Sequence, residues 1–199
     1  PHFRVTGFDG ILPSVRDGGV NLGMSSMTDT VERELQADFV TYFEAGTLWG
    51  QRSGSTVDPT AACGLRVGVA YSTIQDTAEI PAKSDACVAA GLPAIDKVVR
   101  THQDEVTAAL IAGEVDAMSA DSPVTGFAVK LSGGALQPAG EVFDSAPYGW
   151  PVAKGSELAD SLRLALEHVM STGEYRTIAT MWGVDNGMIA QPVINGALR

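Results

Sequence analysis

Apolar residues recur at helical spacing near the start of the chain and then give way to extended patterns. In residues 8–19 three of them fall on one face: Ile11, Leu12 and Val15. This stripe predicts an amphipathic helix, which the pair Gly18-Gly19 ends. The apolar run at 20–26 predicts a short buried strand, and the aromatic-rich stretch at 38–52 predicts a long extended segment.

Strand and helix patterns alternate through the middle of the chain. Short apolar runs predict strands at 64–75, 95–101 and 115–121. The first of these runs ends in a polar turn. Helices are predicted at 103–111, which Gly113 stops, and at 122–134, where Pro123 suits the first turn. Such alternation with short connections is typical of a parallel α/β sheet flanked by helices.

The last part of the chain is predicted to be extended at 143–155 and then helical at 157–170 and 172–182. The first of these helices carries one apolar stripe, made of Leu158, Leu162, Ala165, Leu166 and Val169. Ser156 is placed to cap its start.

Two extended, aromatic-bearing segments, one near Trp49 and one near Trp150, bracket the middle α/β unit. Both are suited to cross between two lobes, so the chain would leave lobe one, build lobe two and return. We expect lobe one at 1–49 with 147–199, and lobe two at 50–146. A hinged protein of this kind binds its ligand in the cleft between the lobes.

Composition narrows the class of protein. The chain has 199 residues, of which 45% are hydrophobic and 19% are charged, and its formal net charge is −11. Nucleic acid is therefore not an expected partner, because phosphates are neutralised by lysine and arginine. No apolar run approaches the ~18 residues that a membrane span requires. The chain begins with Pro1 and not with methionine, so we expect the native start to lie elsewhere.

Two cysteines, Cys63 and Cys87, are 24 residues apart in a predicted strand-helix-strand unit. They are either two unrelated buried thiols or a disulfide, and we favour the disulfide, which would place the protein outside the cytosol. The three histidines show no ligand spacing with each other or with the cysteines. We expect neither a metal nor a cofactor.

Two motifs carry the candidate chemistry. Residues 24–33 join small hydroxyl residues to Arg33, a group suited to a carboxylate. Residues 116–121 end an apolar strand in Asp121, which can receive an ammonium. Taken alone, Arg33 is typical of a solvated helix face, Asp121 of a helix cap and Phe8 of a core. Together the two motifs indicate a free amino acid as ligand.

Four ordered motifs resemble the family 3 extracellular solute-binding proteins, the amino-acid receptors of bacterial ABC importers. The matching segments are FDGILPSVRDGGVNLGMSSMTDTVER, GLRVGVAYST, LIAGEVDAMSADSPV and a C-terminal module from YGWPVAKGSELADSLRLAL to EYRTIATMWG. The resemblance covers nearly the whole chain. It implies a two-lobe, type II periplasmic-binding-protein-like fold with parallel-rich sheets and no catalytic residues.

The resemblance also implies ligand-binding residues. In lobe one, Ser26, Thr28 and Arg33 would receive the ligand carboxylate, and Phe8 would pack along the ligand. The lobe-two turn that closes on the ligand corresponds to Ala70, Thr73, Ile74 and Gln75. Asp121 corresponds to the acid that receives the α-ammonium.

The chain departs from the family pattern at several positions. Ser72 replaces a glycine of the lobe-two turn, and Ser26 replaces the glycine of a G-M-T motif, as in members for basic amino acids. An apolar Ile74 near Ala70 indicates a roomier, less charged side-chain pocket. Family members also carry an N-terminal segment that supplies the first strand and helix of lobe one. We expect a second fragment, an exchanged element or further residues to fill that place.

The resemblance implies a binding protein, not an enzyme, that delivers an amino acid to the membrane permease of an ABC importer. It would act in the extracellular space or cell envelope, either periplasmic or as a lipoprotein. One alternative is an enzyme similar to periplasmic cyclohexadienyl (arogenate) dehydratases, with Glu79 or Asp29 as general acid. Another is a detached ligand-sensing domain.

Overall fold

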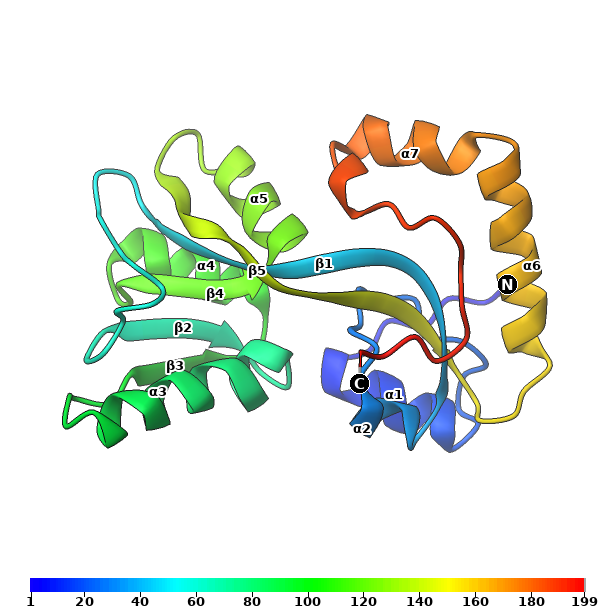
Figure 1. The fold of residues 1–199 in the computed structure, drawn as a ribbon, viewed down its shortest axis with the longest axis horizontal. Helices are drawn as coiled ribbons and strands as arrows, with labels where there is room; N and C mark the ends of the chain where they lie inside the picture. Colours follow the sequence, from blue (N-terminus) through cyan, green and yellow to red (C-terminus); the bar gives the residue numbers. More distant parts are fainter. Residues whose placement is uncertain (199) are drawn as a thin grey trace. The chain divides into compact units, whose positions relative to one another are not determined.

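The computed structural model describes residues 1–198, and the chain divides into two compact units. Unit 1 comprises Pro1–Ala45 and Ala146–Arg199, and unit 2 comprises Gly46–Ser145. Two long strands continue from one unit into the other, β1 (Asp38–Arg52) and β5 (Leu136–Val152) (Figure 1). Trp49 lies in β1, and Trp150 lies in β5.

Unit 2 is built on the five-stranded sheet, whose strand order is β3-β2-β4-β1-β5. The three short strands are β2 (Arg66–Ala70), β3 (Asp96–Arg100) and β4 (Ala117–Asp121). β2 is parallel to both β3 and β4, which confirms the predicted parallel α/β core. β1 joins this core antiparallel to β4, with Thr47 opposite Asp121 and Trp49 opposite Ser119.

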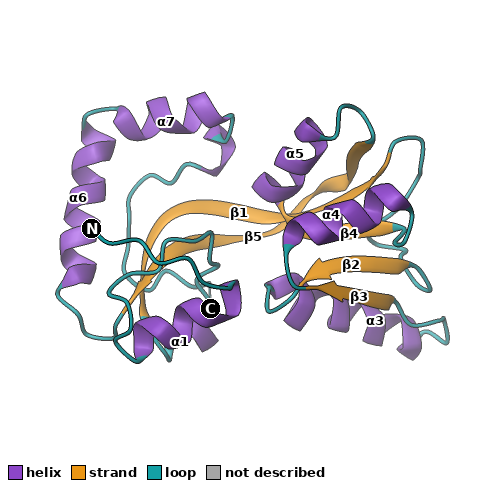
Figure 2. Ribbon diagram, turned by 180° about the vertical axis from the view of Figure 1, so that it is seen from behind, coloured by secondary structure: helices purple, strands orange, loops and turns teal. Residues whose placement is uncertain are grey.

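The helices of unit 2 cover both faces of its sheet. They are α3 (Ile80–Ala89), α4 (Gln103–Ala112) and α5 (Ser122–Leu131). Val67 and Val69 of β2 pack in one cluster with Ile80 of α3, whereas Ala70 packs in another with Val106 of α4. Figures 1 and 2 accordingly show α3 and α4 on opposite sides of the strands.

Close packing explains a glycine in β2. A Cβ added to Gly68 would lie 2.9 Å from a methyl carbon of Val106, so α4 approaches the strand too closely for a larger residue. The sequence placed α4 and α5 correctly, although α5 ends at Leu131, earlier than predicted. A π-helical turn, Gln75–Glu79, leads into α3, and neither element has a clear apolar stripe.

Among its described residues, unit 1 contains four helices and a 3-10 turn: α1 (Phe8–Arg16), α2 (Val31–Glu34), α6 (Leu158–Ser171), α7 (Glu174–Trp182) and Asp185–Gly187. The stripe on α1 is buried as predicted, because Leu12 and Val15 pack with Met27 and Phe39 in one cluster. The helix ends at Arg16, before the glycine pair, and Asp17 is its C-cap.

The predicted strand at 20–26 is wrong. Within it, Leu22 forms an isolated bridge with Val152; a second isolated bridge, between Thr28 and Tyr148, lies just after it. Gly23 donates its N–H to the Pro151 carbonyl at 2.9 Å, but proline has no N–H with which to continue a ladder.

A short segment near the C-terminus lies beside the start of β1. Thr41 N donates to the Val193 carbonyl at 2.9 Å, and Asn195 N donates to the Phe39 carbonyl at 2.8 Å. The Asn195 side chain accepts from Phe39 N at 2.9 Å, and its φ of 59° is one that asparagine tolerates. Residues 193–195 therefore extend the pairing of β1 within unit 1.

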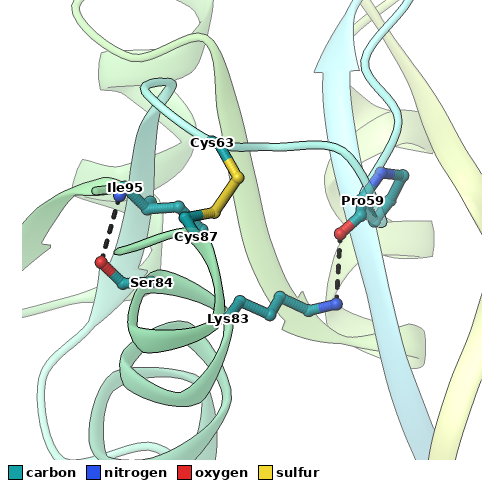
Figure 3. The surroundings of a disulfide bond; sticks show 6 residues. All are labelled: Pro59, Cys63, Lys83, Ser84, Cys87 and Ile95. Carbon is teal, nitrogen blue, oxygen red and sulfur yellow. Dashed lines mark hydrogen bonds between the residues drawn. A yellow bond between two sulfur atoms is a disulfide. The ribbon is translucent and has the colours of Figure 1, made fainter. Parts of the chain in front are cut away.

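The two cysteines form the expected disulfide (Figure 3). Their Cα atoms are 5.5 Å apart, and the bond ties the segment before β2 to α3. Nearby, Lys83 Nζ donates to the Pro59 carbonyl and Ile95 N donates to Ser84 Oγ, each at 3.1 Å. The helix α3 is thus held by contacts of Lys83, Ser84 and Cys87.

Candidate functional site

Arg33 sits in the short helix α2, held by local contacts. Thr30 caps this helix, and its hydroxyl accepts from Arg33 N at 3.3 Å. The guanidinium donates from Nη1 to the Thr28 carbonyl at 2.8 Å, and its central carbon lies 5.7 Å from the centre of the Phe8 ring. Three of the predicted residues of unit 1, Phe8, Thr28 and Arg33, are therefore brought together. The aromatic face and the carbonyl fix the direction of the guanidinium.

The segment before α2 is extended, so its side chains alternate in direction. Met27 and Asp29 are buried, whereas Ser26 is exposed and Thr28 is half-buried. Its backbone is fixed against β5, since Asp29 N donates to the Pro147 carbonyl at 2.8 Å and Gly149 N donates to the Met27 carbonyl at 3.0 Å. Ser26 and Thr28 thus share the accessible side of a rigid segment.

Asp29 is a buried acid in unit 1, and its structural role was not predicted from the sequence. Its Oδ2 accepts from Gly196 N at 2.7 Å, and the neighbouring Glu34 accepts from Ala197 N at 3.0 Å. Burial raises the pKa of Asp29 to about 7; the Gly196 hydrogen bond opposes the shift, and Glu34 adds to it. The two acids hold the C-terminal segment beneath the loop that carries Thr28.

Asp121 ends β4 in unit 2, at the carboxyl edge of the parallel strands. Thr47 lies opposite it on β1. The buried Gln75 amide nitrogen donates to Asp121 Oδ1 at 2.8 Å and to Thr47 Oγ1 at 3.1 Å. The predicted contact residue Gln75 therefore lies behind Asp121 and orients it. A neutral amide does this without cancelling the negative charge.

The turn after β2 presents the other predicted residues of unit 2. Thr73 Oγ donates to the Ala70 carbonyl at 2.8 Å, and Asp76 Oδ2 accepts from Ser72 N at 2.9 Å. Ser72 has a φ of 65°, the left-handed conformation that glycine adopts readily. The turn thus keeps a glycine-like shape despite the serine. Ile74 is half-buried and begins the π-helical turn.

A half-buried acid, Glu79, lies one helical turn beyond Gln75. Its carboxylate accepts from Trp49 Nε1 at 2.8 Å and from the hydroxyl of Ser119. The sequence had offered Glu79 only as one of two unsupported general acids. Its partners lie 30 and 40 residues away, so no local pattern marks them.

Within residues 1–198, His, Cys, Asp and Glu side chains form no group of three or more that could hold a metal ion. In the same part of the chain, no helix has the length and apolar character needed to cross a membrane.

The family comparison matches the bacterial extracellular solute-binding proteins, family 3, over residues 1–185. Over 190 residues the chain is 35% identical to the arginine-binding protein ArgT of Corynebacterium glutamicum, covering 94% of this chain and 62% of that protein. It is 31% identical over 186 residues to an L-arginine-binding protein of Pseudomonas aeruginosa, covering 86% of this chain and 68% of that protein. The chain thus spans less than two thirds of the Corynebacterium relative.

Solved structures show the same fold. An ancestral arginine-binding protein bound to arginine is 30% identical, with a TM-score of 0.80, and the match covers 91% of this chain and 79% of that one. The arginine-, lysine-, histidine-binding protein ArtJ from Geobacillus stearothermophilus is 27% identical, with a TM-score of 0.76 over 88% of this chain and 75% of that one.

Proposed function

Because the chain belongs to family 3 of the bacterial extracellular solute-binding proteins, we propose that it binds a free amino acid. Asp121 carries this proposal, because it is a carboxyl group at the carboxyl edge of β4 that a buried amide orients. Ligands of α/β proteins bind at that edge of the strands. An amino acid's α-ammonium is the cation that such a carboxylate would receive.

Arg33 is proposed to donate hydrogen bonds to the ligand carboxylate, together with Ser26 and Thr28. The guanidinium is aimed by the Phe8 ring and the Thr28 carbonyl, so little side-chain freedom remains to be lost on binding. A planar fork can give a carboxylate two parallel hydrogen bonds. Charge-assisted hydrogen bonds of this kind contribute roughly 1.5–3 kcal/mol each.

We propose arginine as the first ligand to test. Two relatives with at least 30% identity are named for arginine, and the most similar solved structure described above holds it. A third relative, from Bacillus subtilis, is a glutamine-binding protein at 27% identity, so glutamine is the next candidate. Both ligands offer the same α-carboxylate and α-ammonium, and they differ only in the side chain.

Delivery to the permease of an ABC importer, in the periplasm or from a lipid anchor, belongs to the same proposal. Family membership supports a location outside the cytosol, and so does the Cys63–Cys87 disulfide, since disulfides persist in oxidising compartments.

Binding is favoured over dehydration by the state of the two candidate acids. Glu79 is engaged by Trp49 and Ser119, and Asp29 by Gly196. Each acid already serves as an acceptor inside its own unit. A general acid must instead reach a proton position on the substrate.

Isothermal titration calorimetry with the L-amino acids tests the proposal. We expect binding of arginine or glutamine and its loss in Asp121→Ala. Asp116→Ala is the matched control, since Asp116 lies before the same strand and pairs with Arg66 at 2.6 Å. No binding of any amino acid by the wild type, or full affinity in Asp121→Ala, would overturn the assignment.

A further inference from the structure

The first and last residues of the π-helical turn, Gln75 and Glu79, both contact the antiparallel ladder between β1 and β4. Gln75 bonds to the pair Thr47 and Asp121, which face each other across the ladder. One helical turn later, Glu79 meets the next pair on the same face of the sheet, Trp49 and Ser119. Side chains two residues apart on a strand point to the same face, so the two pairs are neighbours.

Glu79 accepts a hydrogen bond from each member of the pair Trp49 and Ser119, one with each carboxylate oxygen. Oε1 accepts from Trp49 Nε1 at 2.8 Å, and Oε2 accepts from Ser119 Oγ. Trp49 is 0% exposed and Ser119 is 1% exposed, so neither donor can turn to solvent. One side chain therefore fixes the separation of β1 and β4 directly beside the pair that contains Asp121.

Neighbouring charged groups also act on the pKa of Glu79. Burial raises the pKa of the Glu79 carboxyl, while the hydrogen bonds from Ser119 and Trp49 and the charge of Lys83 act to lower it; Asp144 acts in the raising direction. Lys83 is held in place by the Pro59 carbonyl at 3.1 Å and by the Phe143 ring, whose centre lies 4.8 Å away. A carboxylate oxygen remains a better acceptor for two donors than a protonated acid.

We infer that Glu79 is a positioning residue for the ammonium acceptor Asp121, an inference that rests on the proposed function. Asp121 follows Ser119 by two residues on β4, and Thr47 precedes Trp49 by two residues on β1. Fixing Trp49 against Ser119 sets the distance between Thr47 and Asp121, both of which Gln75 must reach. Recognition of a charged group requires its acceptor to be held within about 0.5 Å of the productive position.

A merely structural role for Glu79 would weaken every ligand equally, whereas a positioning role weakens only recognition of the ammonium. The probes are therefore L-arginine and 5-guanidinopentanoate, which is the same molecule without its α-ammonium. Calorimetry gives the ratio of the two affinities for each protein. Asp121→Asn defines the ratio that remains when the acceptor charge is lost.

The variants are Glu79→Met, which removes both acceptors at similar length, and Ser119→Ala, which removes one donor and leaves Glu79 in place. We expect Glu79→Met to lower the affinity ratio at least about fivefold and Ser119→Ala to lower it about twofold. The affinity for 5-guanidinopentanoate should change less than about twofold in each. Asp116→Asn, the matched acid before β4, should leave the ratio unchanged.

Equal losses for both probes in the two variants would show that Glu79 only supports the fold, and would overturn the inference alone. An unchanged ratio in Ser119→Ala and Glu79→Met would do the same. A wild type that binds neither probe nor any other amino acid would overturn the proposed function and this inference with it. Ser119→Ala keeps the test decisive if Glu79→Met does not fold.

Discussion

The side-chain amide nitrogen of Gln75 lies 2.8 Å from Oδ1 of Asp121, although 46 residues separate them in the chain. The same nitrogen reaches Thr47 at 3.1 Å, so both amide hydrogens are used. Gln75 is 2% exposed and cannot exchange these partners for water. The amide thus acts as a support for a charged acceptor and leaves its charge intact.

Gln75→Leu is expected to lower the affinity for an L-amino acid about tenfold or more, because Asp121 loses a hydrogen bond to a charged group. Calorimetry measures the affinity, and urea unfolding separates it from stability. Gln51→Leu is the matched control, because Gln51 is likewise a buried glutamine. It lies on β1 and donates to the Pro138 carbonyl at 3.1 Å. Equal affinity losses in the two variants would remove Gln75 from the site.

Arg33→Lys is expected to lose at least about tenfold in affinity, or about 1.4 kcal/mol, because an ammonium gives a point charge where the guanidinium gives a fork. Arg16→Lys, on the exposed end of α1 where Arg16 pairs with Asp17, should have no effect. A neutral or tighter-binding Arg33→Lys would contradict the carboxylate assignment.

Asp29 should make the wild type less stable as the pH rises from about 4 to about 7. The folded state holds the Asp29 proton up to a pKa of about 7, whereas an ordinary aspartate releases it near 3.8. Between these values the folded state binds more protons, so the free energy of unfolding falls with pH, by at most about 4 kcal/mol, and levels off above pH 7.

Asp29→Asn mimics the protonated acid and should remove this slope, leaving the variant about 1–3 kcal/mol more stable than the wild type at pH 8. Urea unfolding from pH 4 to 8 measures the difference. Asp38→Asn is the control of opposite sign. Burial acts to raise the pKa of Asp38, but hydrogen bonds from Asn195, Gly155 and Lys154 hold this pKa below its usual range. A pH-independent difference for Asp29→Asn would refute the assignment.

Replacing Cys63 and Cys87 together with serine should lower the free energy of unfolding by roughly 3 kcal/mol, because the closed loop no longer restricts the unfolded chain. Reduction of the wild type should give a similar loss. Thiol labelling of the unreduced, denatured protein should find no free cysteine. Two labelled cysteines would show that the bond does not form in solution.

Ser72→Gly should leave stability within about 0.5 kcal/mol of the wild type, because relief of the left-handed conformation is offset by the greater freedom of glycine when unfolded. Ser72→Val should lose more than about 1 kcal/mol, since a β-branched residue resists a φ of 65°. Thermal unfolding of the two variants provides the comparison. Equal stability of glycine and valine would contradict the turn geometry.

Local patterns predicted the elements whose signals are contained in a few neighbouring residues. The stripe at Ile11, Leu12 and Val15 predicted α1, and apolar runs predicted β2 and β4. The same reasoning set no bounds for the helix α3, because only Ile80 and Cys87 of that helix are buried and no stripe marks it. It also gave a false strand at 20–26, where Pro151 on the partner segment cannot continue the pairing.

The sequence by itself determined the chemistry available to this protein: a guanidinium after small hydroxyl residues, an aspartate at the end of an apolar strand, and two cysteines at a bridgeable spacing. The tertiary structure decided which of these groups act together. The antiparallel register of β1 and β4 sets Trp49 opposite Ser119 and Thr47 opposite Asp121. Glu79 can therefore bond to both members of the first pair, and Gln75 to both members of the second. Hydrogen bonds act over about 3 Å, so partners tens of residues apart are selected only once the strands have paired.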